Sequence, residues 1–267
     1  MKKLLILFMV CMSFTVFAKS KDVNIVLKDN NFFAVTEAFT ETLLEKFNRK
    51  IMTYDGKEMF IYLDSPGGSV FAMSRIIGIM KASDIKFTCV ARFAASAAFA
   101  MFQQCDNRYM LYDGIIMQHN ASGGFRGEFP RIYSLLNAIN DLVKDVEKNS
   151  ARRMKMKLKD YKVAINNNLW LSRATASKYG AVDNIINNIK CSPGLVKKVV
   201  NKAIRKCGWL SCTVSYKKFS GCPLLTQPLP KKDKSKEEDD TEWKEDINTG
   251  IKDFMWIYRG NLPFRDK

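Results

Sequence analysis

The 267-residue sequence is poor in histidine, since His119 is the only one in the chain. Zinc sites in proteins draw on several histidine and cysteine ligands at characteristic spacings, and no such pattern is present. We therefore expect neither a metal nor a cofactor. Internal repeats are also lacking, apart from an alternation of strand-like and helix-like segments.

Acidic residues are outnumbered, with 27 against 43 lysines and arginines, and the formal charge is +16. The basic residues are spread along the chain, and many lie in a C-terminal tail that also carries acidic ones. This distribution favours solubility and weak attraction to acidic surfaces over nucleic-acid binding. Apolar residues make up 47% of the chain, enough for a large core, which excludes wholesale disorder.

The apolar run near the N-terminus, residues 4–17, is too short to span a bilayer comfortably. Lys2 and Lys3 precede it, and Val16 and Ala18 place small residues at the −3 and −1 positions of a cleavage site. We predict a signal peptide over residues 1–18 and export, either periplasmic or secreted, without a membrane span.

Loss of a signal peptide removes Cys11 and leaves six of the seven cysteines. An even count in an oxidising compartment favours disulfides. Cys89 and Cys105 each lie in an apolar run, so we expect them to be buried thiols. The disulfide candidates crowd into one C-terminal segment, and their three possible pairings stay open: Cys191, Cys207, Cys212 and Cys222.

The spacing of apolar residues predicts an α/β fold. We expect strands at 23–27, 59–63, 85–90, 108–112 and 115–119, helices at 35–47, 69–82 and 94–102, and a last core element at 174–182. This alternation indicates stacked right-handed strand–helix units with a largely parallel sheet. Pro130 opens a long helix. Its apolar face is wide enough to need cover from its own domain or another subunit: Ile132, Leu135, Leu136, Ile139, Leu142, Val143 and Val146.

Composition divides the rest of the chain. After a core domain at 19–190 comes a basic, cysteine-bearing extension at 191–227. Residues 228–247 are rich in proline, lysine and glutamate and are predicted to be a linker. The segment 248–267 returns to apolar residues, and we consider that it docks back on the core.

Three short stretches carry residue types suited to acyl transfer. A buried strand runs into Ser-Pro-Gly-Gly at 65–68 and then a helix, which leaves backbone N–H groups free to hold an oxyanion. Ser96 follows a strand among alanines, and His119 ends the next strand. Taken singly, such features are more often a plain turn, a helix N-cap and a packed histidine.

Together, these stretches resemble the proteolytic subunit of Clp protease. Residues 61–70, IYLDSPGGSV, are similar to that family's signature, 94–96 to its nucleophile motif and 116–119 to its histidine motif. The glycines at 123 and 124 before a long helix resemble the handle through which Clp rings pair, and residues 174–183 resemble its closing segment. The resemblance implies the fold shared by Clp protease and crotonase, with a protruding handle helix.

The resemblance also implies a serine endopeptidase, a hydrolase in which Ser96 is the nucleophile and His119 its base. The N–H groups of Gly68 and Ala97 form the implied oxyanion hole, and the implied substrate-binding residues are Gly67, Ser69 and Val70. Asn168 occupies the position where the family carries aspartate. An asparagine can orient the imidazole but supplies no charge, so reduced activity is expected unless an acid such as Asp160 substitutes.

Two alternatives stay open. A serine–lysine enzyme, like the signal-peptide peptidases of the same fold, would use Lys144 or Lys148 as base. A catalytically silent module would bind peptide by strand addition or serve in assembly. We expect peptides or unfolded proteins as substrates, a homo-oligomer formed through the handle helix, and no ATP-driven unfoldase, because the segment before the first strand is short and exported proteins meet little ATP.

Overall fold

A mixed sheet forms the framework of the protein, whose computed structural model describes residues 23–207 and 212–230. Strands β2 to β5 are parallel, and β6 runs antiparallel beside β5. The strand order is β2-β3-β4-β5-β6, and β7 also pairs with β5. The strands are β2 (Phe32–Val35), β3 (Glu58–Ser65), β4 (Lys86–Ala95), β5 (Asn107–Gln118), β6 (Leu169–Ser172) and β7 (Asn184–Ile186).

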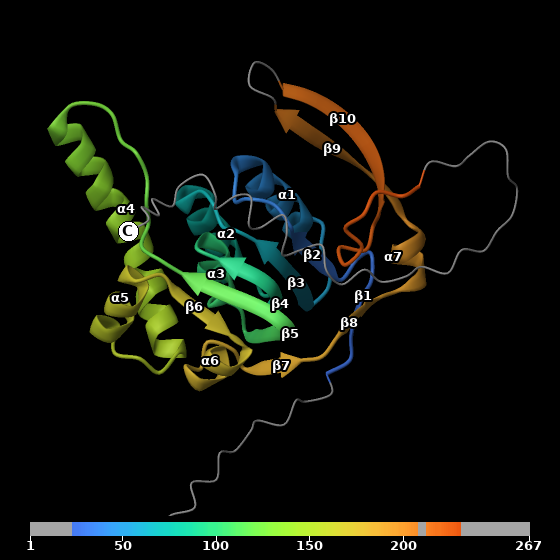
Figure 1. Ribbon diagram of the computed structural model, residues 1–267, viewed down its shortest axis with the longest axis horizontal. Helices are drawn as coiled ribbons and strands as arrows, with labels where there is room; N and C mark the ends of the chain where they lie inside the picture. The colour runs from blue at the N-terminus through green and yellow to red at the C-terminus, as the bar shows by residue number, and fades with distance from the viewer. Residues whose placement is uncertain (1–22, 208–211, 231–267) are drawn as a thin grey trace, which may run out of the picture. The chain divides into compact units, whose positions relative to one another are not determined.

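Helices follow the strands in the order expected of an α/β fold, and this confirms the predicted fold class (Figure 1). They are α1 (Glu41–Met52), α2 (Val70–Ala82), α3 (Ala97–Phe102), α4 (Phe129–Arg153), α5 (Leu158–Asn166), α6 (Arg173–Lys178) and α7 (Pro193–Lys197). None of the helices among the described residues is both long and apolar enough to cross a membrane. Two smaller sheets pair β1 (Ile25–Leu27) with β8 (Ile189–Cys191), and β9 (Val199–Cys207) with β10 (Cys212–Ser220).

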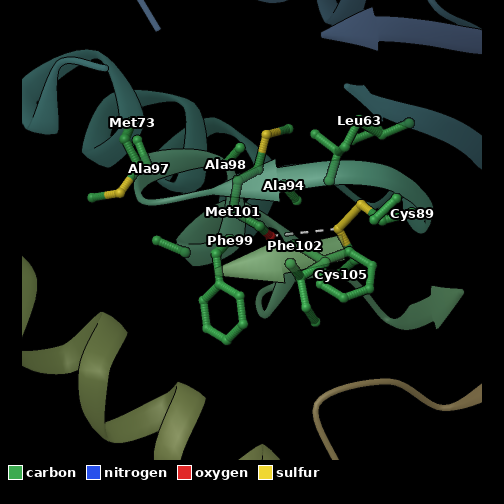
Figure 2. Packing of buried hydrophobic residues seen from close by; sticks show 14 of the residues in the cluster. Leu63, Met73, Cys89, Ala94, Ala97, Ala98, Phe99, Met101, Phe102 and Cys105 are labelled. Carbon is green, nitrogen blue, oxygen red and sulfur yellow. Dashed lines mark hydrogen bonds between the residues drawn. A yellow bond between two sulfur atoms is a disulfide. The ribbon is translucent and has the colours of Figure 1, made fainter. Parts of the chain in front are cut away.

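The central strands are buried on both faces. Successive side chains of a strand point to opposite sides, so each strand contributes to two apolar clusters. Ile61 and Cys89 face the larger cluster, which includes the α3 residues shown in Figure 2. Tyr62 and Val90 face the smaller one, beneath β1, β8 and α7. A strand apolar on both faces is typical of a parallel sheet with two covered sides.

The first predicted helix begins later than its apolar spacing indicated. Val35 belongs to β2 and pairs with Leu63 of β3, so it is not part of the helical stripe. Helix α1 begins at Glu41, where the Thr40 side chain accepts a hydrogen bond from the N–H of Leu43 and caps the helix. Pairing with β3 therefore outweighs the helical period at this end of the segment.

The two strands expected at 108–112 and 115–119 are one strand, β5. Its pairing with β4 shifts register, since Ala91 pairs with Met110 and Phe93 with Ile115. The extra residues of β5 at this irregularity include the exposed Tyr112. The polar Asp113 and the glycine after it thus mark a local bulge, which the sequence pattern presents as a break between strands.

Disulfides join cysteines both in the extension and in the core. Cys191 and Cys222 are bonded, which selects one pair among the four candidates. In the β9–β10 hairpin the register sets Cys207 opposite Cys212. The expectation of free thiols at Cys89 and Cys105 is wrong, because these residues also form a disulfide (Figure 2). Pairing of Thr88 with Asn107 brings the two cysteines to a Cα separation of 5.9 Å, a distance typical of disulfides.

The apolar face of α4 is only partly covered, and two of its residues, Leu135 and Leu142, are exposed. The helix buries Val146, Ser150 and Ala151 near its C-terminal end. Towards the N-terminal end Tyr133 is 65% exposed and Leu135 40%. The wide stripe predicted for this helix is therefore packed against the core mainly where α4 meets α2, α3 and α5.

Other predicted segments lie outside the described residues. These are the signal peptide at 1–18, most of the linker at 228–247, and the C-terminal segment at 248–267. The extension at 191–227 contains α7 and the β9–β10 hairpin.

A buried arginine ties the last core element to the sheet. Arg108 is 4% exposed, and its guanidinium donates to Asp183 Oδ1 at 2.6 Å and to Gln103 Oε1 at 2.6 Å. Burial alone would raise the pKa of Asp183, but the hydrogen bonds and charge of Arg108 outweigh it and hold this pKa below its usual value. Asp183 therefore stabilises the fold above its unfolded-state pKa, and this contribution disappears as pH falls through the depressed folded-state value.

Asp183→Ala is expected to lower the free energy of unfolding by about 3 kcal/mol near pH 7, because Arg108 is left buried without its carboxylate. Urea unfolding measures this loss. The matched control is Asp145→Ala, which removes an exposed ion pair with Lys148 and should cost less than about 1 kcal/mol. The gap between wild type and Asp183→Ala should close as the pH is lowered. Equal effects of the two variants at pH 7 would refute this role of Asp183.

Candidate active site

Ser96 and His119 come to the same edge of the sheet because they follow neighbouring parallel strands. Ala95 is paired with Met117, and the N–H of Ser96 donates to the carbonyl of Met117 at 2.9 Å. His119 follows Gln118, the last residue of β5. Carboxyl ends of parallel strands are where α/β proteins build their ligand sites. Both residues line one pocket at this edge.

The backbone at Ser96 has an uncommon conformation, with φ 55° and ψ −118°. A non-glycine residue at positive φ is strained, and such strain clusters at functional sites. Ser96 stands at the N-cap position of α3, yet its side chain makes no capping hydrogen bond. Ser96 therefore does not cap α3 with its side chain. A sharp strand-to-helix turn that leaves the hydroxyl free is the arrangement of a nucleophile elbow.

Gly67 packs directly against this turn. Its φ is +97°, and an added Cβ would lie 2.8 Å from Cβ of Ser96 and 2.9 Å from the nitrogen of Ala97. No side chain fits in that space without displacing backbone. The glycine thus explains how the loop after β3 and the loop after β4 come into contact.

Two backbone N–H groups near Ser96 are free within the described structure. Phe39 donates to the carbonyl of Gly67 at 2.8 Å and accepts from Ser69 at 2.9 Å. This bridge does not use the N–H of Gly68, which has no acceptor among the described residues. Ala97 is the first residue of α3, where N–H groups lack an intrahelical partner. Ala97 lines the pocket together with Ser96, whereas Gly67 and Gly68 are not among the residues that line it.

The other two residues predicted to bind substrate, Ser69 and Val70, make different contacts. Ser69 caps α2 by accepting a hydrogen bond from the N–H of Ala72 at 3.3 Å. Val70, the first residue of α2, lines the pocket. The predicted substrate-binding stretch therefore borders the pocket through Val70, while Ser69 holds the helix that follows.

His119 is half-buried, and this burial lowers the pKa of its imidazole below the ordinary value. A neutral imidazole near pH 7 has a nitrogen free to accept a proton. Within the described structure neither this ring nor the Ser96 hydroxyl has a hydrogen-bond partner, and the two are therefore not bonded to each other. Hydrogen bonds of catalytic groups often form only when substrate is bound.

Asn168 lies beside His119 at the same sheet edge. Antiparallel pairing sets Leu169 opposite Gln118, so the next residues in each direction are Asn168 and His119. Asn168 has φ 54° and precedes β6. A 2.5 Å hydrogen bond from the Asn120 side chain to that of Asn166 joins the segment after His119 to the end of α5. The register thus brings the backbone of Asn168 close to that of His119, but no hydrogen bond joins the two side chains in the described structure, and Asn168 does not line the pocket.

The alternative bases are placed less favourably. Lys144 is exposed on α4, and Lys148 forms an ion pair with Asp145 at 3.5 Å. Asp160 is exposed on α5. None of the three lines the pocket that contains Ser96 and His119.

The pocket also contains polar residues for which no role of their own is predicted from the sequence. These are Gln118, Glu147 and Tyr161, which come from β5, α4 and α5. Its walls are mainly apolar, formed by Val70, Met73, Ala97, Ala100, Val143 and Val146. Gln118 belongs to the histidine motif at 116–119, so a local signal for it is present in the sequence. Glu147 and Tyr161 have no comparable local signal, because only the packing of α5 against α4 brings them here.

Comparison with known proteins agrees with this architecture. The family model of Clp protease matches residues 18–189. The chain therefore belongs to the Clp protease family, a family of peptidases.

Individual relatives are distant. The chain is 26% identical over 173 residues to the ATP-dependent Clp protease proteolytic subunit 2 of Borreliella burgdorferi, covering 62% of this chain and 87% of the relative. It is 30% identical over 133 residues to the proteolytic subunit of Oltmannsiellopsis viridis, covering 48% and 68%. Subunit 1 of Prochlorococcus marinus is 28% identical over 134 residues, covering 49% and 68%.

Proposed function

We propose that this protein is an exported serine endopeptidase that cleaves peptides or unfolded proteins with Ser96 and His119. The observation that carries the proposal is the meeting of a free serine hydroxyl on a strained turn with the only histidine in one pocket. Membership of a peptidase family supports the reaction class. Export is supported by the disulfides, which persist mainly in oxidising compartments.

The reaction follows from these positions. Ser96 Oγ attacks the carbonyl carbon of the scissile bond while His119 takes the hydroxyl proton. The resulting oxyanion accepts hydrogen bonds from the N–H groups of Gly68 and Ala97. Collapse breaks the C–N bond, and His119 gives its proton to the leaving amine. Water, deprotonated by His119, then attacks the acyl ester, and this releases the carboxylate product and restores the Ser96 hydroxyl.

Asn168 orients the imidazole in this scheme by accepting from one ring nitrogen. Because the asparagine is neutral, it does not stabilise the imidazolium that forms during attack. The proposal therefore includes a modest rate, set by orientation and by the oxyanion hole.

Cleavage without ATP tests the function. The purified oxidised protein should cleave a reduced and carboxymethylated protein and leave its native form intact, with no ATP present. Ser96→Ala should abolish the cleavage. Cleavage that survives in Ser96→Ala would assign the activity elsewhere. Absence of cleavage by the wild type would favour the silent peptide-binding module.

We also propose that copies of the chain associate through α4. Phe129, Tyr133, Leu135 and Leu142 are exposed on this helix, and a second copy would remove them from water. Light scattering should give a mass of several chains, and Leu135→Lys/Leu142→Lys should lower it. Asn137→Lys, on the exposed side of the same helix, is the control. A monomeric wild type would contradict this assembly.

A further inference from the structure

The pocket beside Ser96 contains polar atoms that have no partner, or only a weak one, in the described structure. Tyr161 is fully buried, and within the described structure its hydroxyl oxygen has a marginal contact with the Ser150 hydroxyl but no hydrogen bond of good geometry. The neighbouring Ser150 hydroxyl donates instead to the carbonyl of Val146 at 2.8 Å. The side-chain oxygen of Gln118 is buried and unpartnered. Because buried polar atoms are nearly always paired, an unpaired oxygen and a weakly paired one on two residues of the same pocket point to a donor from outside the chain.

Glu147 adds a negative charge to the same pocket. Val143, Val146 and Glu147 are three and four residues apart, so they share one face of α4. The Glu147 side chain is 15% exposed, and its contact with the well-exposed Lys162 is long, at 3.6 Å. Among the described residues that line the pocket, none is lysine or arginine. The carboxylate therefore keeps capacity for a cation.

The apolar walls narrow the choice of ligand. Between Ser96 and Glu147 the pocket is lined by Val70, Met73 and Ala100, together with the α4 valines. These walls favour a side chain with an apolar stem, and the polar oxygens favour a head that only donates hydrogen bonds. Lysine and arginine have this build, because their ammonium and guanidinium groups carry no acceptor.

We propose that the pocket receives the lysine or arginine side chain of the substrate residue whose carbonyl Ser96 attacks, and that Glu147 selects it. The inference rests on the proposed peptidase function. Neutral or acidic side chains would leave the Gln118 oxygen unpaired and would leave Glu147 with only its long contact to Lys162. A site of this kind discriminates strongly against an analogue that lacks the matching group.

Matched peptides test the selection. Two fluorogenic peptides differ at the acyl-side residue, one with lysine and one with methionine, which is similar in length but neutral. We expect kcat/KM for the lysine peptide to be about tenfold to a hundredfold higher, the value of one or two charged hydrogen bonds. In Glu147→Gln the ratio should fall at least tenfold. Lys162→Gln is the control, since it removes the exposed partner of Glu147 and should preserve or increase the preference.

Binding separates this inference from the peptidase function. In Ser96→Ala, fluorescence anisotropy should show tighter binding of the lysine peptide than of the methionine peptide. The difference should disappear in Ser96→Ala/Glu147→Gln. Hydrolysis without a preference for lysine would refute the pocket inference and leave the peptidase intact. A binding preference that depends on Glu147, in a protein whose wild type does not hydrolyse peptides, would support the pocket inference and refute the peptidase function. If the wild type shows no hydrolysis and the lysine peptide is not bound preferentially, both the peptidase function and the pocket inference are refuted.

Discussion

Replacing Ser96 by alanine is expected to lower kcat/KM for peptide hydrolysis by about 10⁴-fold or more, because the reaction loses its nucleophile. Structural damage is not expected to contribute, since the hydroxyl makes no hydrogen bond within the described structure. The remaining rate would come from the oxyanion-binding amides and from substrate positioning. Initial rates on a fluorogenic peptide measure the loss, and circular dichroism checks the fold.

Two further variants complete this experiment. Ser177→Ala removes a hydroxyl from the exposed surface of α6 and should retain the wild-type rate. His119→Ala should lose nearly as much activity as Ser96→Ala. The double variant should be no worse than either single one, because nucleophile and base act as a unit. Additive losses would show that the two residues act in separate steps, contrary to the proposed mechanism.

Asn168→Asp should raise kcat/KM by at least about tenfold, since a carboxylate stabilises the imidazolium that an amide only orients. The reverse exchange in a serine protease costs about 10⁴-fold, which gives the upper limit. The register that places Asn168 beside His119 is the basis for this expectation.

The pH profile gives a second readout of the same variant. Burial lowers the pKa of His119, so in the wild type kcat/KM should rise with pH through a midpoint below the ordinary histidine value. A carboxylate at 168 favours the charged ring and raises this pKa, which moves the rise to higher pH. Asn167→Asp adds the same charge one residue away, at the C-cap of α5, and is the control. Identical pH profiles for Asn168→Asp and Asn167→Asp would show that Asn168 is not the residue that orients His119.

Much of the framework was predictable because its signals are local. The strand entering residues 65–68, the long helix opened by Pro130 and the order of the motifs all depend on short stretches of sequence. Segments governed by pairing were harder. Strand β6 is four residues long and forms by pairing with β5, so the sequence has no periodic pattern from which it could be predicted. The disulfide between Cys89 and Cys105 likewise depends on the register of β4 with β5.

The candidate site divides along the same line. Ser96, His119 and the glycine loop could be named because each lies in a motif. The contact between Gly67 and the Ser96 turn is tertiary, as is the gathering of Glu147 and Tyr161 around the pocket. Single acidic and aromatic residues on amphipathic helices give no local sign of such a role.

A fluorophosphonate provides the most direct measurement on Ser96 itself. Mass spectrometry of the labelled and digested protein should locate one phosphonyl adduct on Ser96, formed much more slowly in His119→Ala. This result would mean that the hydroxyl is activated by the only imidazole of the chain. An unmodified Ser96 in the folded protein, or labelling at the same rate without His119, would contradict the proposed catalytic pair.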